Sequence, residues 1–561
     1  MARGDALHHL QHGVDVLVIG GGITGAGVAL DAASRGYRVG LVEQGDFAGG
    51  TSSRSTKLIH GGIRYLPQGH LTLVRDALRE RTRLLHLAPH LVRPLPFLLP
   101  LYSGLRRPLG LHVPAAIRPL VPLGIRAALI AYDLFARVPA LHHRAVSRIW
   151  VEREAPDIRT DDLRAAFVYT DARTDDVRLT HAVLAAARAH GAITLNYATV
   201  VDLARSGGLL TGARVEDRLS GRLIEGHARF IVNATGIWAE RVAEMDGPAP
   251  FRLRHSVGTH LVLRPGAIRT SLAVVIPETD DGRLAFIIPW AGRFVVGTTD
   301  LPYNDDLSAP VPTAGEVAYL LSHANRYLRR PLRTDDVTGA FAGVRPLLAA
   351  DSSTAALPRD HRVTVSPGGL INIAGGKLTT YLKMAEDTVD VIAARDGTVR
   401  TCRTAHIPLA GSSGLEEARA ALAISSLSAD QQAHLLAAYG SAALDVLELI
   451  SAEPSLGRGL VDGLSVSAAE VVYACRAEQA VSLTDCLYLR TRLAVLDAAA
   501  ADDAVCDVGA LMAAELGWDA AERGRQQRMY EERRDRERAW VSAMPEAARA
   551  VERGLPSLPG S

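Results

Sequence analysis

Residues 20–25, near the N-terminus, have the glycine spacing of a dinucleotide-binding turn. They follow a short apolar run and precede a stretch with helical spacing, so we expect them to join a buried parallel strand to a helix. Gly20 permits the tight turn, Gly22 lets the backbone approach a pyrophosphate, and Gly25 allows close packing of helix on strand. Glu43 ends the next predicted strand, where it can accept hydrogen bonds from an adenosine ribose. The cofactor-binding residues predicted here are Gly20, Gly21, Gly22, Thr24, Gly25 and Glu43.

Two further turns help to choose between NAD and FAD, which share this fingerprint. Residues 231–236 run from an apolar strand into Ala-Thr-Gly, which resembles a turn of two-domain FAD proteins near the dinucleotide. Residues 375–380 follow another strand and start a helix, whose N-terminus would stabilise negative charge on a reduced flavin ring. A simple NAD dehydrogenase has no obvious use for these turns, so we predict FAD. The residues expected to contact it here are Ala234, Thr235, Gly236, Gly376, Lys377, Leu378 and Thr379.

A family resemblance is carried by residues 51–65, which read Thr-Ser-Ser-Arg-Ser-Thr-Lys-Leu-Ile-His-Gly-Gly-Ile-Arg-Tyr. This segment resembles a stretch of FAD-dependent glycerol-3-phosphate dehydrogenases. Matches follow in the same order at residues 232–236, 343–347 and 375–381, so the resemblance spans roughly residues 15–381. It adds to the predicted cofactor-binding residues Thr51, Ser52, Ser53, Lys57 and Gly61.

The resemblance implies that sn-glycerol 3-phosphate is oxidised to dihydroxyacetone phosphate, with hydride passing from the secondary alcohol carbon to the flavin. It also implies that electrons go to a membrane quinone, menaquinone or ubiquinone. The expected location is therefore cytoplasmic, peripherally bound to the inner face of the cell membrane, and a homodimer is a further option. Two enzyme alternatives stay open: a glycerol-3-phosphate oxidase that uses dioxygen, and a related FAD amine or hydroxy-acid oxidase. The non-enzyme alternative is a flavin-binding membrane-surface module.

Cationic side chains in the matching motifs are candidates for the substrate end. A phosphate dianion favours donors that stay charged, and a planar guanidinium supplies paired N–H bonds. By resemblance, Arg64 and Tyr65 contact the phosphate, while Arg345 and Lys377 lie near the reacting carbon and the flavin. Arg345 is thus predicted both to bind substrate and to act in catalysis. The alternatives are that the arginines are surface residues and that Lys377 instead holds the flavin or a backbone carbonyl.

Alcohol oxidation also needs a proton acceptor, because hydride departs more easily from an alkoxide-like oxygen. His60 and His260 are the histidines nearest the matching motifs. We take His260 as the candidate base, although a histidine beside a sheet is more often structural, and His60 could only support its loop. Arg345 and Lys377 could lower the pKa of the alcohol even if no histidine acts. The identity of the base stays open.

The composition of the chain argues against several other classes of protein. Lys and Arg total 62 against 61 Asp and Glu, so no global field indicates a nucleic-acid partner. The four cysteines show no CxxC pair and no metal-ligand spacing with histidine, which predicts neither a disulfide framework nor a metal site. The N-terminus lacks a basic region followed by an apolar core, so we expect no signal peptide.

The predicted fold is α/β: a two-domain FAD-binding (Rossmann-like) oxidoreductase fold with an antiparallel-sheet substrate domain and a helical C-terminal domain. Residues 253–297 alternate polar and apolar side chains, which favours the antiparallel sheet. The sequence from about residue 412 is rich in Ala, Leu, Glu and Arg, which favours helices. We place the oxidoreductase region at residues 12–400 and the helical domain at 401–561. The FAD-binding parts cover about 12–95, 150–245 and 340–400, and the substrate or cap parts about 96–149 and 246–339.

One segment has a composition suited to a membrane surface. The chain has no run of about 18 uncharged apolar residues, so we expect no spanning helix. Residues 98–138 are nevertheless rich in Leu, Ile and Val and are punctuated by arginines. Residues 127–135 could form an amphipathic helix in the interface, with arginines toward anionic headgroups. The alternative is a packed helical insertion over the substrate domain.

Overall fold

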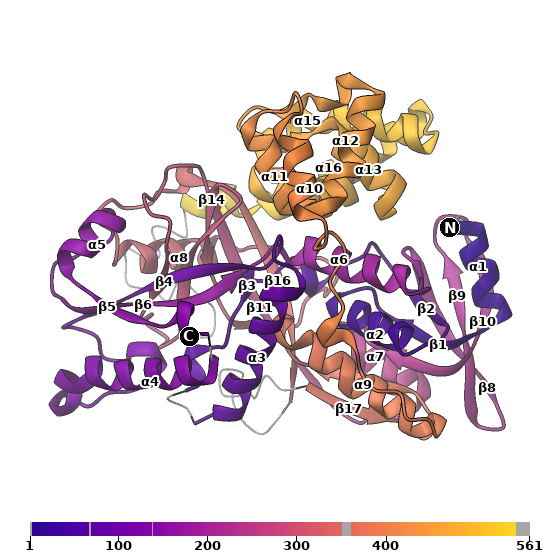
Figure 1. The fold of residues 1–561 in the computed structure, drawn as a ribbon, viewed down its shortest axis with the longest axis horizontal. Coiled ribbons are helices and arrows are strands. Elements are labelled where there is room, and N and C mark those ends of the chain that lie inside the picture. The colour runs from indigo at the N-terminus through magenta and orange to yellow at the C-terminus, as the bar shows by residue number, and fades with distance from the viewer. Residues whose placement is uncertain (1–2, 67–68, 137, 350–360, 546–561) are drawn as a thin grey trace.

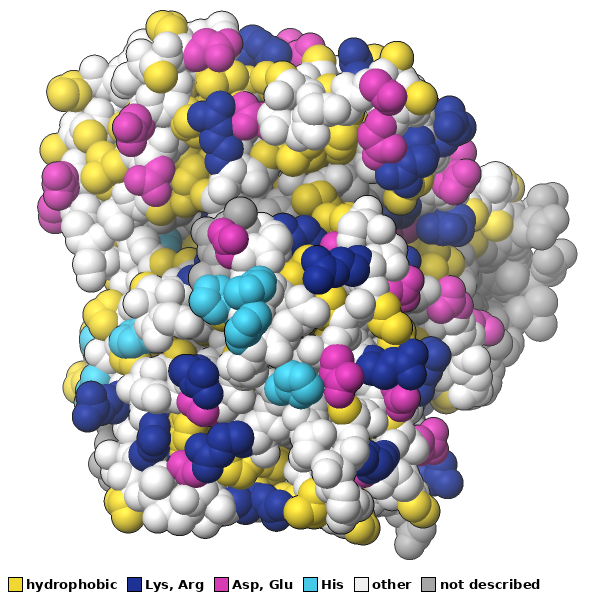
Figure 2. Space-filling model, turned by 90° about the vertical axis from the view of Figure 1, so that its right-hand side faces the viewer, with side chains coloured by type: hydrophobic (Ala, Val, Ile, Leu, Met, Phe, Trp, Pro, Cys, Tyr) yellow, Lys and Arg dark blue, Asp and Glu magenta, His cyan; other side chains and the backbone are white. Residues whose placement is uncertain are grey.

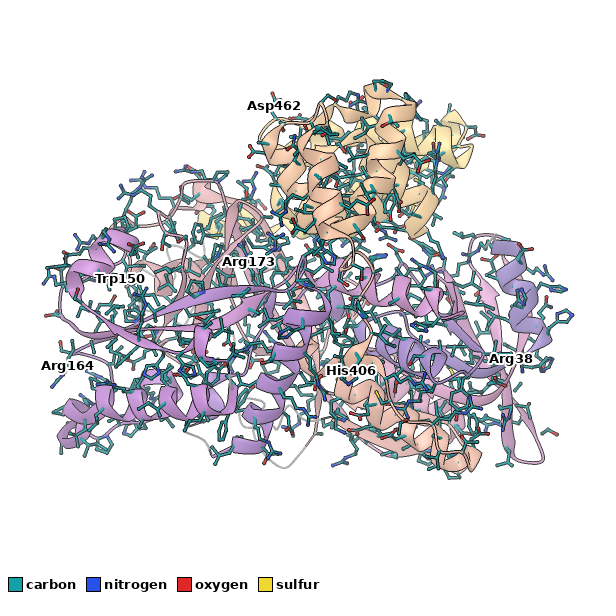
Figure 3. All side chains as sticks on the ribbon, in the orientation of Figure 1. Arg38, Trp150, Arg164, Arg173, His406 and Asp462 are labelled. Carbon is teal, nitrogen blue, oxygen red and sulfur yellow. The ribbon has the colours of Figure 1, made fainter. Side chains whose placement is uncertain are left out.

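The computed structural model describes residues 3–66, 69–136, 138–349 and 361–545. Two lobes, each built on its own sheet, lie side by side, and a cluster of helices from the C-terminal part of the chain sits across them (Figure 1). In Figure 3, Arg38 and Trp150 mark opposite ends of the two lobes, and Arg173 lies between them. This arrangement brings loops from both sheets to a common boundary.

The first sheet has the parallel core predicted for dinucleotide binding. Its order is β17-β18-β10-β1-β2-β7, and all neighbours from β18 to β7 are parallel. Val16 and Val18 face the helices on one side, whereas Leu17 and Ile19 face helix α1 and the β8–β9 strands on the other. Both faces are therefore covered, as the apolar strands require. The strands are β1 (Val14–Ile19), β2 (Val39–Val42), β7 (Ile193–Leu195), β8 (Ala198–Ser206), β9 (Leu209–Asp217), β10 (Arg222–Asn233), β17 (His361–Val365) and β18 (Ile371–Gly375), and the helices are α1 (Arg3–His12), α2 (Ile23–Ser34), α6 (Asp176–Ala189), α7 (Ala239–Ala243) and α9 (Tyr381–Asp396).

The second sheet is largely antiparallel, which confirms the prediction from the alternating residues. β11 pairs antiparallel with both β14 and β16, and among the strands that the structure describes in this sheet only β12 and β4 run parallel. Helix α8 covers one face, and helices α3 and α4 cover the other. Its strands are β3 (Leu58–Ile59), β4 (Arg93–Tyr102), β5 (Arg144–Val146), β6 (Leu163–Arg173), β11 (Leu253–Leu263), β12 (Ala273–Ile276), β13 (Ala285–Trp290), β14 (Arg293–Gly297), β15 (Leu301–Pro302) and β16 (Val337–Leu348), and its helices are α3 (Leu71–Leu87), α4 (Val121–Ala136), α5 (Arg148–Glu154) and α8 (Ala314–Asn325).

The C-terminal part is helical, as predicted, with one small hairpin that the sequence did not suggest. Polar caps define several helix starts, including a capping box between Ser428 and Gln431. Beyond the last of these helices, Trp540 and Met544 pack into the core of the second sheet. The elements are α10 (Leu415–Ala423), α11 (Ala429–Tyr439), α12 (Ala443–Ala452), β19 (Gly459–Val461), β20 (Leu464–Ser467), α13 (Ala468–Glu478), a π-helical turn (Asp485–Arg490), α14 (Leu493–Leu496), α15 (Ala498–Leu516) and α16 (Ala520–Arg538).

Surface charge and hydropathy bear on possible partners. Figure 2 views the end of the molecule that carries α1, and on this face Lys and Arg side chains are interspersed with Asp and Glu. Two helical stretches, Ala115–Ala136 and Ala429–Ala452, are long and apolar enough to span a membrane by length and composition alone. This finding differs from the expectation of no spanning helix, which rested on the absence of a long uncharged apolar run. The difference arises because average hydropathy tolerates the charges, such as Arg118 and Arg126, that interrupt the apolar run.

Candidate active site

A cavity of about 340 Å³ lies where the loops of the two sheets meet. Its size falls within the range of small-molecule and cofactor sites. The structure brings most of the sequence-predicted residues to its wall, from segments that are hundreds of residues apart. These are Gly20, Gly22, Thr24, Glu43, Thr51, Ser52, Tyr65, Ala234, Thr235, Gly236, His260, Arg345, Gly376, Lys377, Leu378 and Thr379.

The first glycine turn is as tight as its spacing predicts. Gly20 has φ +111°, and a Cβ there would lie 2.6 Å from the Ala234 carbonyl oxygen. A Cβ at Gly25 would lie 1.9 Å from the Gly20 oxygen, so helix and strand can meet only without a side chain. Helix α2 begins after Gly22 without a side-chain cap, although the Ile23 N–H donates to Ser52 Oγ at 2.9 Å. The helix start thus faces the cavity as a site for an anion.

Glu43, the residue predicted to contact a ribose, lines the cavity just beyond strand β2. Its carboxylate accepts from the Gly21 N–H at 2.7 Å and from the Gly45 N–H at 2.9 Å. Burial raises the pKa of Glu43 above its ordinary value, and these two N–H groups oppose the rise. A hydroxyl donor in the cavity would further stabilise the ionised carboxylate.

The third turn brings Lys377 to the edge of the substrate sheet. Gly376 has φ +86°, and a Cβ there would lie 2.4 Å from Met384 Sδ, so this bend requires glycine. The Lys377 ammonium lies 4.4 Å from the centre of the Tyr65 ring, within cation–π range. The Thr379 hydroxyl accepts from the His60 N–H at 3.2 Å. This turn therefore joins the start of α9 to the segment with the family-like motif.

Arg345 reaches the cavity from strand β16. Its Nη2 donates to Thr298 Oγ1 at 3.0 Å, and its Nη1 donates to Asp300 Oδ1 at 3.3 Å. Gly258, on the paired strand β11, leaves the space for this guanidinium, because a Cβ there would lie 2.1 Å from Nη2. The positive group is thus fixed by its neighbours while it lines the cavity.

His260 is buried beside this arginine. Its Nε2 lies 2.9 Å from Thr56 Oγ1, and its ring stacks on Phe341 at 4.8 Å. Burial, followed by the charges of Arg345 and Lys57, lowers the pKa of His260 well below its usual value. The imidazole is therefore neutral at pH 7, the form that a proton acceptor requires.

Several predicted residues do not line the cavity. Lys57 is fully buried, with Nζ 2.7 Å from both carboxylate oxygens of Asp176. The Gly61 N–H donates to Tyr132 Oη at 2.9 Å, and the Ser53 hydroxyl donates to the Gly50 carbonyl. The side chain of Arg64 lies outside the described part of the chain. The predicted cofactor residues that the structure places behind the cavity wall are Gly21, Gly25, Ser53, Lys57 and Gly61.

Sequence reasoning missed two cavity arginines. Arg283 lines the wall, and its Nη1 lies 3.8 Å from Asp300 Oδ2, with no hydrogen-bond partner among the described residues. Arg54 also lines the wall, where it is half-buried, and donates to the Ala342 carbonyl at 3.1 Å. Burial lowers the pKa of Arg54 to about 10. Arg54 lies inside the family-like segment, and Arg283 lies inside the alternating segment 253–297; those positions were the available signals.

Family profiles account for most of the chain. A profile described as "FAD dependent oxidoreductase" matches residues 15–382, and one described as "C-terminal domain of alpha-glycerophosphate oxidase" matches residues 402–523. The glycerol-3-phosphate dehydrogenase 2 of Mycobacterium tuberculosis is 37% identical over 530 residues, which cover 92% of this chain and 87% of that protein. The chain belongs to the FAD-dependent glycerol-3-phosphate dehydrogenase family. The human mitochondrial glycerol-3-phosphate dehydrogenase is 36% identical over 531 residues, which cover 90% of this chain and 71% of that protein.

Solved structures agree with this family assignment. A Bacillus halodurans glycerol-3-phosphate dehydrogenase complexed with FAD has a TM-score of 0.78 and 31% identity, over 95% of this chain and 97% of that one. The Mycoplasma pneumoniae L-α-glycerophosphate oxidase, at 18% identity and a TM-score of 0.54, shares the fold; the match covers 70% of this chain and 96% of that one. This family member is an FAD-dependent oxidoreductase with FAD as its cofactor. The uncapped start of α2 and the glycine turns around the cavity fit such a dinucleotide.

Proposed function

We propose that this enzyme oxidises sn-glycerol 3-phosphate to dihydroxyacetone phosphate and passes the electrons to a membrane quinone. The main support is the position of Arg345, whose guanidinium is held by Thr298 beside neutral His260. Both residues line the same cavity as the dinucleotide-binding turns. Bound FAD would supply the two-electron acceptor at this place. The relatives' names support the same substrate.

The protein's own residues would bind the anion and ease loss of the hydroxyl proton. Arg283, Arg345 and Lys377 bring positive charge to one cavity, where phosphate and a developing alkoxide would both be stabilised. His260, neutral and bonded at Nε2 to Thr56, is the proposed proton acceptor. We also retain Arg64 and Tyr65 as proposed phosphate contacts; Tyr65 lines the cavity.

Helix α4 supports the membrane part of the proposal. Ile125, Leu129 and Tyr132 are buried against the substrate sheet, so one face packs as an insertion would. The opposite face leaves Leu123 67% and Leu134 70% exposed. An amphipathic helix with an exposed apolar face and flanking arginines suits the surface of an anionic bilayer. We therefore propose peripheral binding to the inner face of the cell membrane, within reach of menaquinone or ubiquinone.

The choice of electron acceptor tests this proposal against its rivals. The holoenzyme is mixed with glycerol 3-phosphate, with and without a quinone in vesicles, while quinone reduction and hydrogen peroxide are both measured. We expect quinone reduction with little peroxide, and no turnover with glycerol, which lacks the phosphate. Peroxide formed in step with substrate consumption would favour the oxidase. Turnover only with amino or hydroxy acids would favour the other FAD oxidases.

A further inference from the structure

The segment 51–57 connects the cofactor turn to the substrate residues. The Thr51 hydroxyl donates to the carbonyl of Val344, the neighbour of Arg345, at 2.7 Å. Ser52 Oγ accepts from the first N–H of α2, and Thr56 Oγ1 contacts His260 at 2.9 Å. Any shift of this segment would therefore move both ends of the site at once.

Buried charges fix this segment from behind. The Lys57 ammonium donates to the Ser53 carbonyl at 2.8 Å and to both oxygens of Asp176 at 2.7 Å. Asp176 also accepts from the N–H and the hydroxyl of Ser55, at 3.0 and 2.7 Å. Lys57 and Asp176 are both buried, and a buried charge that loses its partner destabilises the folded protein strongly.

The C-terminal domain supplies one of those partners, Arg492. Its side chain is 5% exposed, and Nη2 donates to the Ser53 carbonyl at 3.2 Å while lying 3.5 Å from Asp176 Oδ1. Nη1 donates to the Tyr488 carbonyl at 2.9 Å, which ties the guanidinium to its own domain. Arg492 has φ +63°, uncommon for a residue with a side chain. The side chain of Arg492 is therefore presented by a backbone conformation that few residues with a side chain adopt.

A second arginine, two residues before Arg492, binds the loop that follows Glu43. Arg490 is fully buried and donates to both oxygens of Asp46, at 2.6 and 2.9 Å. Asp46 closely follows Glu43, and its Oδ1 also accepts from Asn196 at 3.0 Å. Arg490 and Arg492, two residues apart in the C-terminal domain, thus each bind a loop of the cofactor site.

We propose that Arg492, assisted by Arg490, is a positioning residue through which the C-terminal domain holds the FAD-binding loops in their active geometry. The inference rests on the proposed placement of FAD in the cavity. Loss of Arg492 would remove a charged donor from the Ser53 carbonyl and leave Asp176 with less compensation. Removal of a charge-assisted hydrogen bond of this kind corresponds to about a tenfold change in an equilibrium constant.

The test uses the full-length enzyme with Arg492→Ala, Arg492→Lys and a control, Arg476→Ala. Arg476 belongs to the same domain, but it pairs at the surface with Glu515. Three quantities are measured: the dissociation constant of FAD from reconstituted apoprotein, the rate of flavin reduction by glycerol 3-phosphate, and the melting temperature of the apoprotein. We expect Arg492→Ala to weaken FAD binding about tenfold. Arg492→Lys should lie between it and wild type, and Arg476→Ala should match wild type.

Wild-type FAD affinity and reduction rate in both Arg492 variants would overturn the proposal. So would a lower melting temperature with unchanged FAD affinity, because that outcome indicates a purely structural role. If Arg492→Ala does not fold, Arg492→Lys decides by the same criterion. Failure of the wild-type protein to bind FAD would instead reject the proposed function, so the two failures are distinguishable.

Discussion

Arg345 enters the cavity already restrained. Thr298 and Asp300 hold two of its nitrogens, and Asp300 also lies 3.8 Å from Arg283. A guanidinium fixed before the substrate arrives loses little conformational entropy on binding, so its charge is preorganised. Asp281 lies 3.3 Å from Nε of Arg283, so carboxylates restrain both guanidinium groups before an anionic substrate binds.

Replacement of this guanidinium should impair chemistry more than cofactor binding. We expect Arg345→Ala to reduce the rate of flavin reduction by glycerol 3-phosphate about 10²-fold or more, because a preorganised cation is lost. FAD content should stay at the wild-type level. Stopped-flow absorbance measures the rate. Arg264→Ala, which removes a partly exposed ion pair with Asp336 at the end of β11, is the control. Normal reduction in Arg345→Ala would contradict the assignment.

His181 gives a stability prediction at the same scale. It is buried, both ring nitrogens lack hydrogen-bond partners among the described residues, and burial lowers its pKa well below the usual value. The folded protein therefore keeps this histidine neutral, whereas the unfolded chain protonates it below about pH 6.5. The unfolded state then binds more protons, so stability falls as the pH drops through this range. We expect His181→Leu to raise the melting temperature relative to wild type more at pH 5 than at pH 7.5; an equal difference at both pH values would contradict this.

At the scale of elements, the sequence predicted those strands, turns and helices that depend on neighbouring residues alone. The strand–turn–helix at residues 14–34 follows from apolar strand residues and glycines whose absent side chains permit the turn. The hairpin of β19 and β20 was not predicted, because its strands are short and lie within an Ala- and Leu-rich region. Arg492 was missed for a different reason: its partners Ser53 and Asp176 lie hundreds of residues earlier in the sequence, and no local spacing encodes such contacts.

Gly25 tests the role of the first turn. A Cβ there would lie 1.9 Å from the Gly20 oxygen, so Gly25→Ala must separate α2 from β1 and displace the helix start from the cavity. We expect FAD content to fall by at least about tenfold, with little loss of secondary structure. Gly124→Ala, in α4 with open space around its Cβ position, should keep full FAD content. Flavin absorbance per protein measures both. Full FAD content in Gly25→Ala would refute this account of the turn.

At the scale of the whole molecule, loops of both sheets line the cavity, and the C-terminal domain contributes Arg490 and Arg492 to the loops beside it. Helix α4 lies along the edge of the substrate lobe (Figure 1), and its Leu123 and Leu134 are exposed. The sequence indicated this segment's composition but not which side would be exposed, because that depends on packing against the substrate sheet. The sequence likewise predicted a helical C-terminal domain without indicating its contacts with the cofactor loops.

The exposed face of α4 predicts where vesicles bind. Replacement of Leu123 and Leu134 by serine removes two exposed apolar side chains, each worth about 1 kcal/mol when partly buried in lipid. We expect at least about a tenfold weaker association with anionic phospholipid vesicles in a sedimentation assay. A matched pair, Leu209→Ser with Leu223→Ser, removes exposed leucines from the β9–β10 strands of the other lobe and should not change binding. If the two pairs of substitutions changed vesicle association equally, α4 would not be the contact surface.

The most direct test of the central claim is an anaerobic titration of the purified, FAD-loaded enzyme with sn-glycerol 3-phosphate. The flavin absorbance should bleach as substrate is added, with one dihydroxyacetone phosphate formed per flavin reduced, while glycerol should leave the spectrum unchanged. A flavin that stays oxidised in excess glycerol 3-phosphate would contradict the account.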